Sequence, residues 1–186
     1  MPAFAYAHIG IGAASGFMSG LAHPLSGLDH VCAMLAVGLW AVQMGGRSVW
    51  AVPLTFVSVM VLGSALPVLN PSLPFIEQGI VLSVLLLGVL IAASIRLPLW
   101  LGSGMAGLFA LWHGYAHGVE IPASSSSMGY ALGFVLITVL LHVTGIVLGL
   151  GIQRLPALDC AEGTRKRIVN LTGASIALCG AYLAVA

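Results

Sequence analysis

Two short stretches of the chain concentrate the side chains that could bind a metal ion or move a proton. One runs from His23 to His30 and the other from His113 to Glu120. Imidazole nitrogens together with carboxylate oxygens suit borderline divalent ions such as Ni²⁺, Co²⁺ and Zn²⁺, and they suit Ca²⁺ or Mg²⁺ poorly. Both stretches therefore predict transition-metal chemistry, in competition with protons because a bound imidazole must be neutral. The candidate ligands in them are His23, Asp29, His30, His113, His117 and Glu120.

In the second stretch, helical spacing predicts that the ligands form one stripe. A residue four positions along a helix lies about 40° round, and one seven along lies about 20° back. His113, His117 and Glu120 would therefore share a face. A polar stripe on an otherwise apolar helix should face the interior of a bundle. Gly114 and Gly118 would let another backbone approach closely.

The first stretch is less regular. Pro24 and Gly27 argue against one smooth helix, and a break there would free backbone carbonyls that can bind ions. His23 and His30 would align only if the helix continued, since they are seven residues apart. Asp29 would be costly in a membrane unless it is paired with a cation, and no basic side chain is near it in sequence.

Two further histidines are candidates for the same chemistry. His142 lies in an apolar run, and the sequence leaves open whether it bonds a neighbouring helix or adds a ligand. His8 depends on processing, because residues 5–7, Ala-Tyr-Ala, are typical of a signal-peptidase site. Cleavage there would add a free amine beside the imidazole, and residues 1–7 would be the remnant of a signal peptide.

The composition indicates what kind of scaffold must position these residues. The chain has 186 residues, of which 60% are hydrophobic and 6% charged, whereas soluble domains carry roughly 25% charged residues. Disorder is excluded because disordered chains are polar. We therefore expect a single transmembrane domain over residues 1–186, surrounded by lipid. The net charge of +1 makes nucleic acid an unexpected partner, and a homo-oligomer stays open.

Hydropathy predicts the fold class, an all-α polytopic transmembrane bundle of about seven helical segments with six or seven full spans. Helices are the default in lipid because they satisfy their own backbone, and no segment alternates polar and apolar residues as a barrel strand would. The three cysteines are too few for a disulfide framework, and Cys32 and Cys179 should act as small hydrophobes. The segments are 6–22, 28–45, 49–69, 75–95, 97–118, 128–152 and 167–186.

The basic residues predict the orientation. If the segments from residue 28 onward each cross once, all of the basic residues face the same side, which the positive-inside rule makes cytoplasmic. Asp29 and His30 then open one segment at its outer end, and Glu120 closes another at its outer end. The two motifs would lie at similar depth, as a site loaded from outside requires. The basic residues are Arg47, Arg96, Arg154, Arg165, Lys166 and Arg167.

The first segment leaves two solutions for the number of spans. With a cleaved, outward N-terminus, segment 6–22 would be re-entrant or shallow and the chain would cross six times. With an uncleaved, cytoplasmic N-terminus, the chain would cross seven times. Residues 8–22 would measure about 22 Å as a helix, short of a hydrocarbon core of about 30 Å. We therefore favour the first solution.

Taken together, the two motifs resemble those of the HupE/UreJ family. The pattern His-x5-Asp-His at 23–30 and the pattern His-Gly-x-Ala-His-Gly-x-Glu at 113–120 carry the resemblance. His142, followed by Gly145, also fits it, and so does the Gly-rich opening. Trp112 departs from it, since the family usually has Phe there. The resemblance implies a nickel or cobalt permease that supplies metal for hydrogenase or urease maturation, with a signal peptide cleaved before a histidine.

We therefore expect a multi-pass permease of the bacterial inner membrane that takes up Ni²⁺ or Co²⁺ and is not an enzyme. The chain has no phosphate loop for nucleotide hydrolysis and no sign of an organic cofactor. Transport would be facilitated, proton-coupled or driven by other subunits. The main alternative is an intramembrane zinc hydrolase, with Ser26 or Glu120 assisting proton transfer. A haem-binding electron carrier with two axial histidines is a further one.

Overall fold

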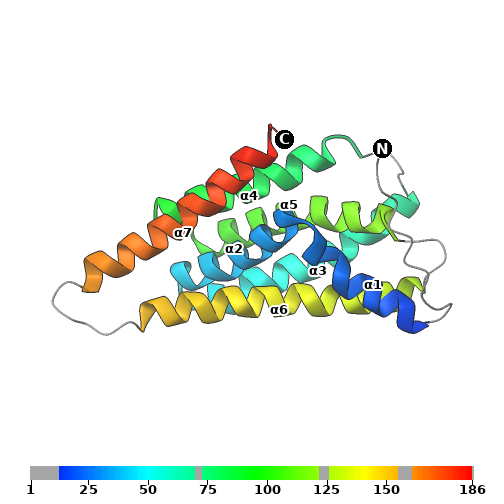
Figure 1. The fold of residues 1–186 in the computed structure, drawn as a ribbon, viewed down its shortest axis with the longest axis horizontal. Helices are drawn as coiled ribbons and strands as arrows, with labels where there is room; N and C mark the ends of the chain where they lie inside the picture. Colours follow the sequence, from blue (N-terminus) through cyan, green and yellow to red (C-terminus); the bar gives the residue numbers. More distant parts are fainter. Residues whose placement is uncertain (1–12, 70–72, 122–125, 155–160, 186) are drawn as a thin grey trace.

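The chain folds into helices that lie alongside one another in an elongated bundle (Figure 1). The computed structural model describes residues 13–69, 73–121, 126–154 and 161–185, and these ranges contain seven α-helices and no strand. The expected all-α fold is therefore confirmed. The helices are α1 (Ala13–Ser26), α2 (Leu28–Met44), α3 (Ser48–Leu69), α4 (Ile76–Ala92), α5 (Leu99–Val119), α6 (Ser127–Gln153) and α7 (Ala161–Leu183).

Most helix ends agree with the apolar segments, and the two larger differences have physical causes. Helix α7 begins at Ala161 rather than at residue 167, because its first two turns carry the basic residues that hydropathy excludes. Helix α1 continues through Pro24 to Ser26, and the break between α1 and α2 falls at Gly27, whose backbone is extended (φ −106°, ψ 123°). The residues before α1, including His8 and the expected cleavage site, lie outside the described ranges.

The expectation of six or seven full spans is supported only in part. Within the described residues, α3 and α6 are each long and apolar enough to cross a membrane, and the pair α1–α2, bent by 83°, would add a third span if counted as one. Helices α1, α2 and α4 have 14, 17 and 17 residues, so α1 is too short for a full crossing and the other two are at the lower limit of about 17 residues. Helix α5 loses hydropathy to its histidines. The bend fits either a broken span or a re-entrant loop, so both solutions for the first segment stand.

Glycines hold the helices close together around the histidine motifs. A Cβ at Gly114 or Gly118 of α5 would collide with the backbone oxygens of Met60 and Ser64 on α3, which confirms the expected close approach. Helices α2 and α6 touch in the same way, since Gly38 faces the backbone next to Gly145. Backbone contact of this kind is how small residues fix helix pairs where burial of apolar surface gives little force.

The polar residues separate toward opposite ends of the bundle. Helix α2 ends, α5 begins, α6 ends and α7 begins at one end, on the left of Figure 1, and the basic residues lie at these junctions. The start of α1, the end of α5 and the start of α6 lie toward the other end (Figure 1). The gathering of the basic residues on one side is thus seen in the fold, and its assignment to the cytoplasm stays a prediction.

Candidate metal site

The last turn of α1 meets the last turn of α5 at a cluster of three metal-type ligands. His23 Nε2 lies 2.8 Å from Glu120 Oε2. His23, His117 and Glu120 each offer a ligand atom, and these atoms all lie within 4.8 Å of one another. We call these three residues the mouth cluster. A divalent ion at about 2 Å from each ligand needs separations of this order.

Further histidines continue from the mouth cluster into the bundle. The ring of His30 at the start of α2 lies 4.5 Å from that of His117 and 5.3 Å from that of His113, measured between centroids. Phe56 of α3 contacts both His113 and His142, with ring centroids 5.5 Å and 5.1 Å away. We call His30, His113 and His142 the inner histidines. His117 adjoins both groups.

Hydrogen bonds orient two of the inner histidines with one nitrogen free. His30 Nδ1 lies 2.7 Å from Asp29 Oδ1, and His113 Nδ1 donates to the carbonyl of Phe109 at 2.9 Å. With Nδ1 as donor, Nε2 of each ring carries a lone pair, and neither Nε2 has a hydrogen-bond partner among the described residues. Metal-binding histidines typically donate their other nitrogen to a carboxylate or a carbonyl in this way.

Two other imidazoles have no hydrogen-bond partner at all within the described ranges. Both ring nitrogens of His117 and both of His142 are buried and unsatisfied. A buried polar group without a partner costs roughly 1–3 kcal/mol, so this cost should be removed by a ligand that accepts or supplies a bond there. A divalent transition metal, which takes lone pairs from imidazole, is a suitable ligand.

Two members of the mouth cluster are partly exposed, and the other described histidines are buried. The side chains of Glu120 and His23 are 47% and 30% exposed. His30 is 9% exposed, and His117 and His113 are 1% and 0% exposed. The arrangement can therefore take an ion at an open end and pass it between neighbouring imidazoles into a dry interior.

The break at Gly27 brings the first motif to the second. The 83° bend turns α2 away from the line of α1, and the rings of His23 and His30 lie 6.3 Å apart. A Cβ at Gly27 would lie 2.5 Å from Asp29 Oδ1 and 3.0 Å from His30 Nδ1. The absent side chain thus leaves room for the pair formed by Asp29 and His30.

The structure gathers the predicted residues into one region and gives Asp29 a specific part. Asp29 accepts a hydrogen bond from the backbone N–H of His30 at 2.8 Å and also bonds the His30 ring. The partner of this carboxylate is therefore an imidazole and not a Lys or Arg side chain. His142 is 2% exposed and lies at the inner side. His8 lies outside the described residues. The residues brought together are His23, Asp29, His30, His113, His117, Glu120 and His142.

Sequence reasoning missed the aromatic residues that line this region. Tyr130 and Phe134 of α6 stack on each other, and their rings lie 5.9 Å from His23 and 4.2 Å from His117 respectively. Phe56 lies against the rings of both His113 and His142. Aromatic residues in an apolar helix are usually packing, so only the contact between α6 and α1 could have revealed their place. The sequence predicts Gly27 as a helix breaker, but not its close approach to Asp29.

The fold and the cluster together define an all-helical protein with apolar spans and an interior lined by histidines and carboxylates. The family model described as HupE / UreJ protein matches residues 1–183. The chain is 42% identical over 186 residues to Protein HupE of Rhizobium leguminosarum bv. viciae, covering 100% of this chain and 92% of that protein. The chain therefore belongs to the HupE/UreJ family, which confirms the resemblance. No solved structure matches it, and nothing in these comparisons supports a zinc hydrolase.

Proposed function

We propose that the protein is a multi-pass permease of the bacterial inner membrane that takes up Ni²⁺ or Co²⁺. The single observation that carries the proposal is the row of buried imidazoles with free nitrogens that begins at an exposed carboxylate. The chain's place in the HupE/UreJ family supports delivery of the metal to hydrogenase or urease maturation. The basic end would face the cytoplasm and the mouth cluster would face outward.

The path would use the ligands in succession. Glu120 and His23 would bind the hydrated ion at the mouth, and His117 would replace further waters. His30 and His113 would then hold the ion through Nε2, with Asp29 fixing the His30 tautomer. His142 would be the innermost station, and Phe56 would limit the opening between it and His113.

Metal accumulation in cells that lack their own nickel uptake tests the proposal. The cells would express the full chain with trace Ni²⁺ or Co²⁺ outside. His113→Ala would be compared with Leu108→Ala, a control on the same helix whose side chain is 50% exposed on the bundle surface. We expect accumulation with the wild type and the control, and none with His113→Ala at equal membrane levels. A wild type that is well inserted yet moves neither metal would overturn the proposal.

A further inference from the structure

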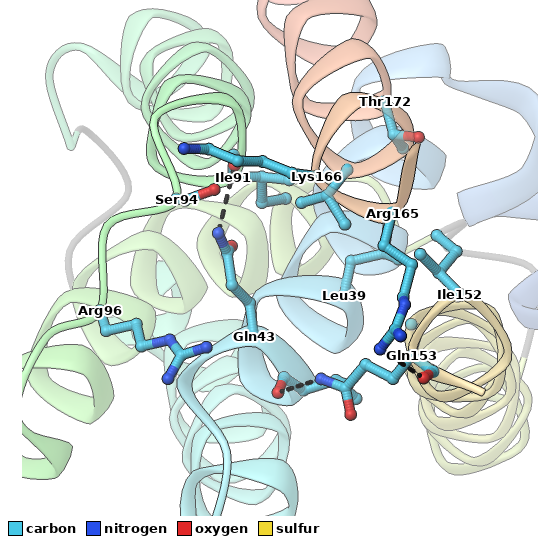
Figure 2. A pocket seen from close by; sticks show the side chains of 13 residues that line it. Leu39, Gln43, Ile91, Ser94, Arg96, Ile152, Gln153, Arg165, Lys166 and Thr172 are labelled. Atoms are coloured by element: carbon cyan, nitrogen blue, oxygen red, sulfur yellow. Dashed lines mark hydrogen bonds between the residues drawn. The ribbon is translucent and has the colours of Figure 1, made fainter. Parts of the chain in front are cut away.

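A second polar region lies at the basic end of the bundle, far along the chain's helices from the histidines. A cavity of about 450 Å³ opens there between α2, α4, α6 and α7. Figure 2 shows Arg96, Arg165 and Lys166 placed around it, with Gln43 and Gln153 between them. The cations come from the link before α5 and from the start of α7, so segments distant in sequence converge on one space.

The charge around this cavity is uncompensated within the described part of the chain. No described carboxylate lines the cavity, and both ion pairs in the described ranges join a histidine to an acid near the other end. Arg165 makes one long hydrogen bond, from a terminal nitrogen to the carbonyl of Gln153 at 3.4 Å. Its Nε is buried with no partner among the described residues, so this donor is free to bond a ligand in the cavity.

The positive-inside rule explains why basic residues gather at this end, but not why three of them share a cavity. Arg47 lies at the same end outside the cavity, and its guanidinium sits 5.7 Å from the ring centre of Trp50. Arg167 is exposed on α7 and also lies outside it. Basic residues placed as Arg47 and Arg167 are, outside the cavity, would already meet the positive-inside rule.

The walls of the cavity indicate the kind of anion. Leu39, Ile91 and Val169 contribute apolar surface beside the cations. A basic pocket between membrane helices at the cytoplasmic side is a typical site for an anionic lipid headgroup, and Arg binds phosphate oxygens through its planar set of donors. A phosphodiester with a glycerol backbone would meet both the cations and the apolar wall.

We propose that this cavity binds a phosphate-bearing anion, with the headgroup of an anionic phospholipid as its ligand. The proposal does not depend on metal transport. Free inorganic phosphate shares the same chemistry and would occupy the cationic part alone. The bound anion would tie the start of α7 to α2 and to the link before α5.

Native mass spectrometry and thermal unfolding of the purified full-length protein in detergent test the site. The probes would be phosphatidylglycerol, phosphatidylcholine, and sodium phosphate against sodium chloride at equal ionic strength. The triple variant Arg96→Gln, Arg165→Gln, Lys166→Gln would be compared with the control Arg47→Gln, Arg167→Gln, which removes cations from the same end outside the cavity. A milder variant, Arg165→Lys, keeps the charge and loses the Nε donor if the triple variant folds poorly.

We expect phosphatidylglycerol to bind and to raise the unfolding temperature of the wild type and the control, while phosphatidylcholine does neither. The triple variant should bind it about 100-fold more weakly, and Arg165→Lys should lie between. Stabilisation by sodium phosphate alone, lost in the triple variant, would support the site and identify a free anion as the ligand. Equal binding of the two lipids, or an equal loss in the control, would overturn the proposal. A wild type that binds neither lipid nor phosphate would also overturn it.

Discussion

The mouth cluster and the inner histidines are built from similar residue types, but they differ in exposure and in hydrogen bonding. At the mouth, His23 and Glu120 bond each other at 2.8 Å and remain partly open to solvent. Inside, the free nitrogens of His30, His113 and His142 have no hydrogen-bond partner among the residues the structure describes. Solvent and mutual bonding satisfy His23 and Glu120, whereas His117 and the inner histidines keep nitrogens that would be satisfied only by a bound ligand. Under the proposed function, affinity for the ion should therefore depend mostly on His117 and the inner histidines, and capture of the ion on His23 and Glu120.

The largest effect should come from His117, because it adjoins both regions. His117→Ala removes the imidazole that is 4.9 Å from the ring of His23 and 4.5 Å from that of His30. We expect Ni²⁺ binding to the purified protein to weaken by more than about 100-fold, beyond the usual effect of losing a residue that only supports a ligand. Equilibrium dialysis would measure this, with Leu108→Ala as the control. Unchanged Ni²⁺ binding would show that His117 does not connect the mouth cluster with the inner histidines.

Asp29 should have the next largest effect, through the orientation of an inner histidine. Asp29→Asn replaces an acceptor with a group that can also donate, so the His30 ring loses the carboxylate that holds Nδ1–H and leaves Nε2 free. We expect about 10-fold to 100-fold weaker Ni²⁺ binding. Glu77→Gln, which neutralises an exposed acid at the start of α4, is the matched control. Equal affinities for Asp29→Asn and wild type would mean that Asp29 does not act through His30.

Gly27 offers a way to disturb the same pair without changing any polar group. Gly27→Ala places a methyl group 2.5 Å from Asp29 Oδ1 and 3.0 Å from His30 Nδ1. The side chain can shift to relieve part of the overlap, so a strain of about 1 kcal/mol and roughly fivefold weaker uptake are expected. Gly104→Ala is the control, since a Cβ there meets nothing within 4 Å. A Gly27→Ala protein that transports as well as the control would show that the space at Gly27 is not needed.

Glu120 should show how little the exposed pair formed by His23 and Glu120 contributes to affinity. Exposed ion pairs are worth about 0.2–1 kcal/mol, and the Glu120 side chain is 47% exposed. Glu120→Gln should therefore raise the Ni²⁺ concentration for half-maximal uptake about twofold, with the maximal rate unchanged. Transport measured over a range of Ni²⁺ concentrations separates the two parameters. A collapse of the maximal rate would contradict the distinction between the mouth cluster and the inner histidines.

The sequence was sufficient for the parts of this arrangement that depend on local spacing. The stripe of His113, His117 and Glu120 follows from helical periodicity, and the helices follow from hydropathy. The break at Gly27 could be placed only roughly, because a helix can contain Pro24 when its neighbours satisfy the backbone. The contacts of His23 with Glu120 and of His117 with Phe134 join segments far apart in the chain, and no local pattern encodes such pairings.

The number of spans is harder to predict for a related reason. Hydropathy judges each helix by its own residues, whereas in a bundle neighbouring helices can shield a short or polar helix from lipid. The two histidines of α5 lower its hydropathy, although both are buried against other helices. The residues that give the protein its chemistry therefore also obscure the helix that bears them.

Helix α7 contributes to neither group of ligands, and its packing gives the smallest expected effect. The Sγ atoms of Cys32 on α2 and Cys179 on α7 lie 3.7 Å apart, close enough for an oxidant to join them with modest adjustment. Cys160→Ser removes the third thiol. Oxidation of this folded variant with copper–phenanthroline should form a disulfide between Cys32 and Cys179, so that neither thiol then reacts with a maleimide. Because the link would join two atoms that already lie in contact and involves neither Asp29 nor His30, it should leave Ni²⁺ uptake unchanged. Cys32→Ser, in which a single thiol stays reactive, is the control.

Thiols that remain fully reactive after oxidation would show that α7 does not pack on α2. Efficient linkage with loss of uptake would mean that the inner histidines move during transport.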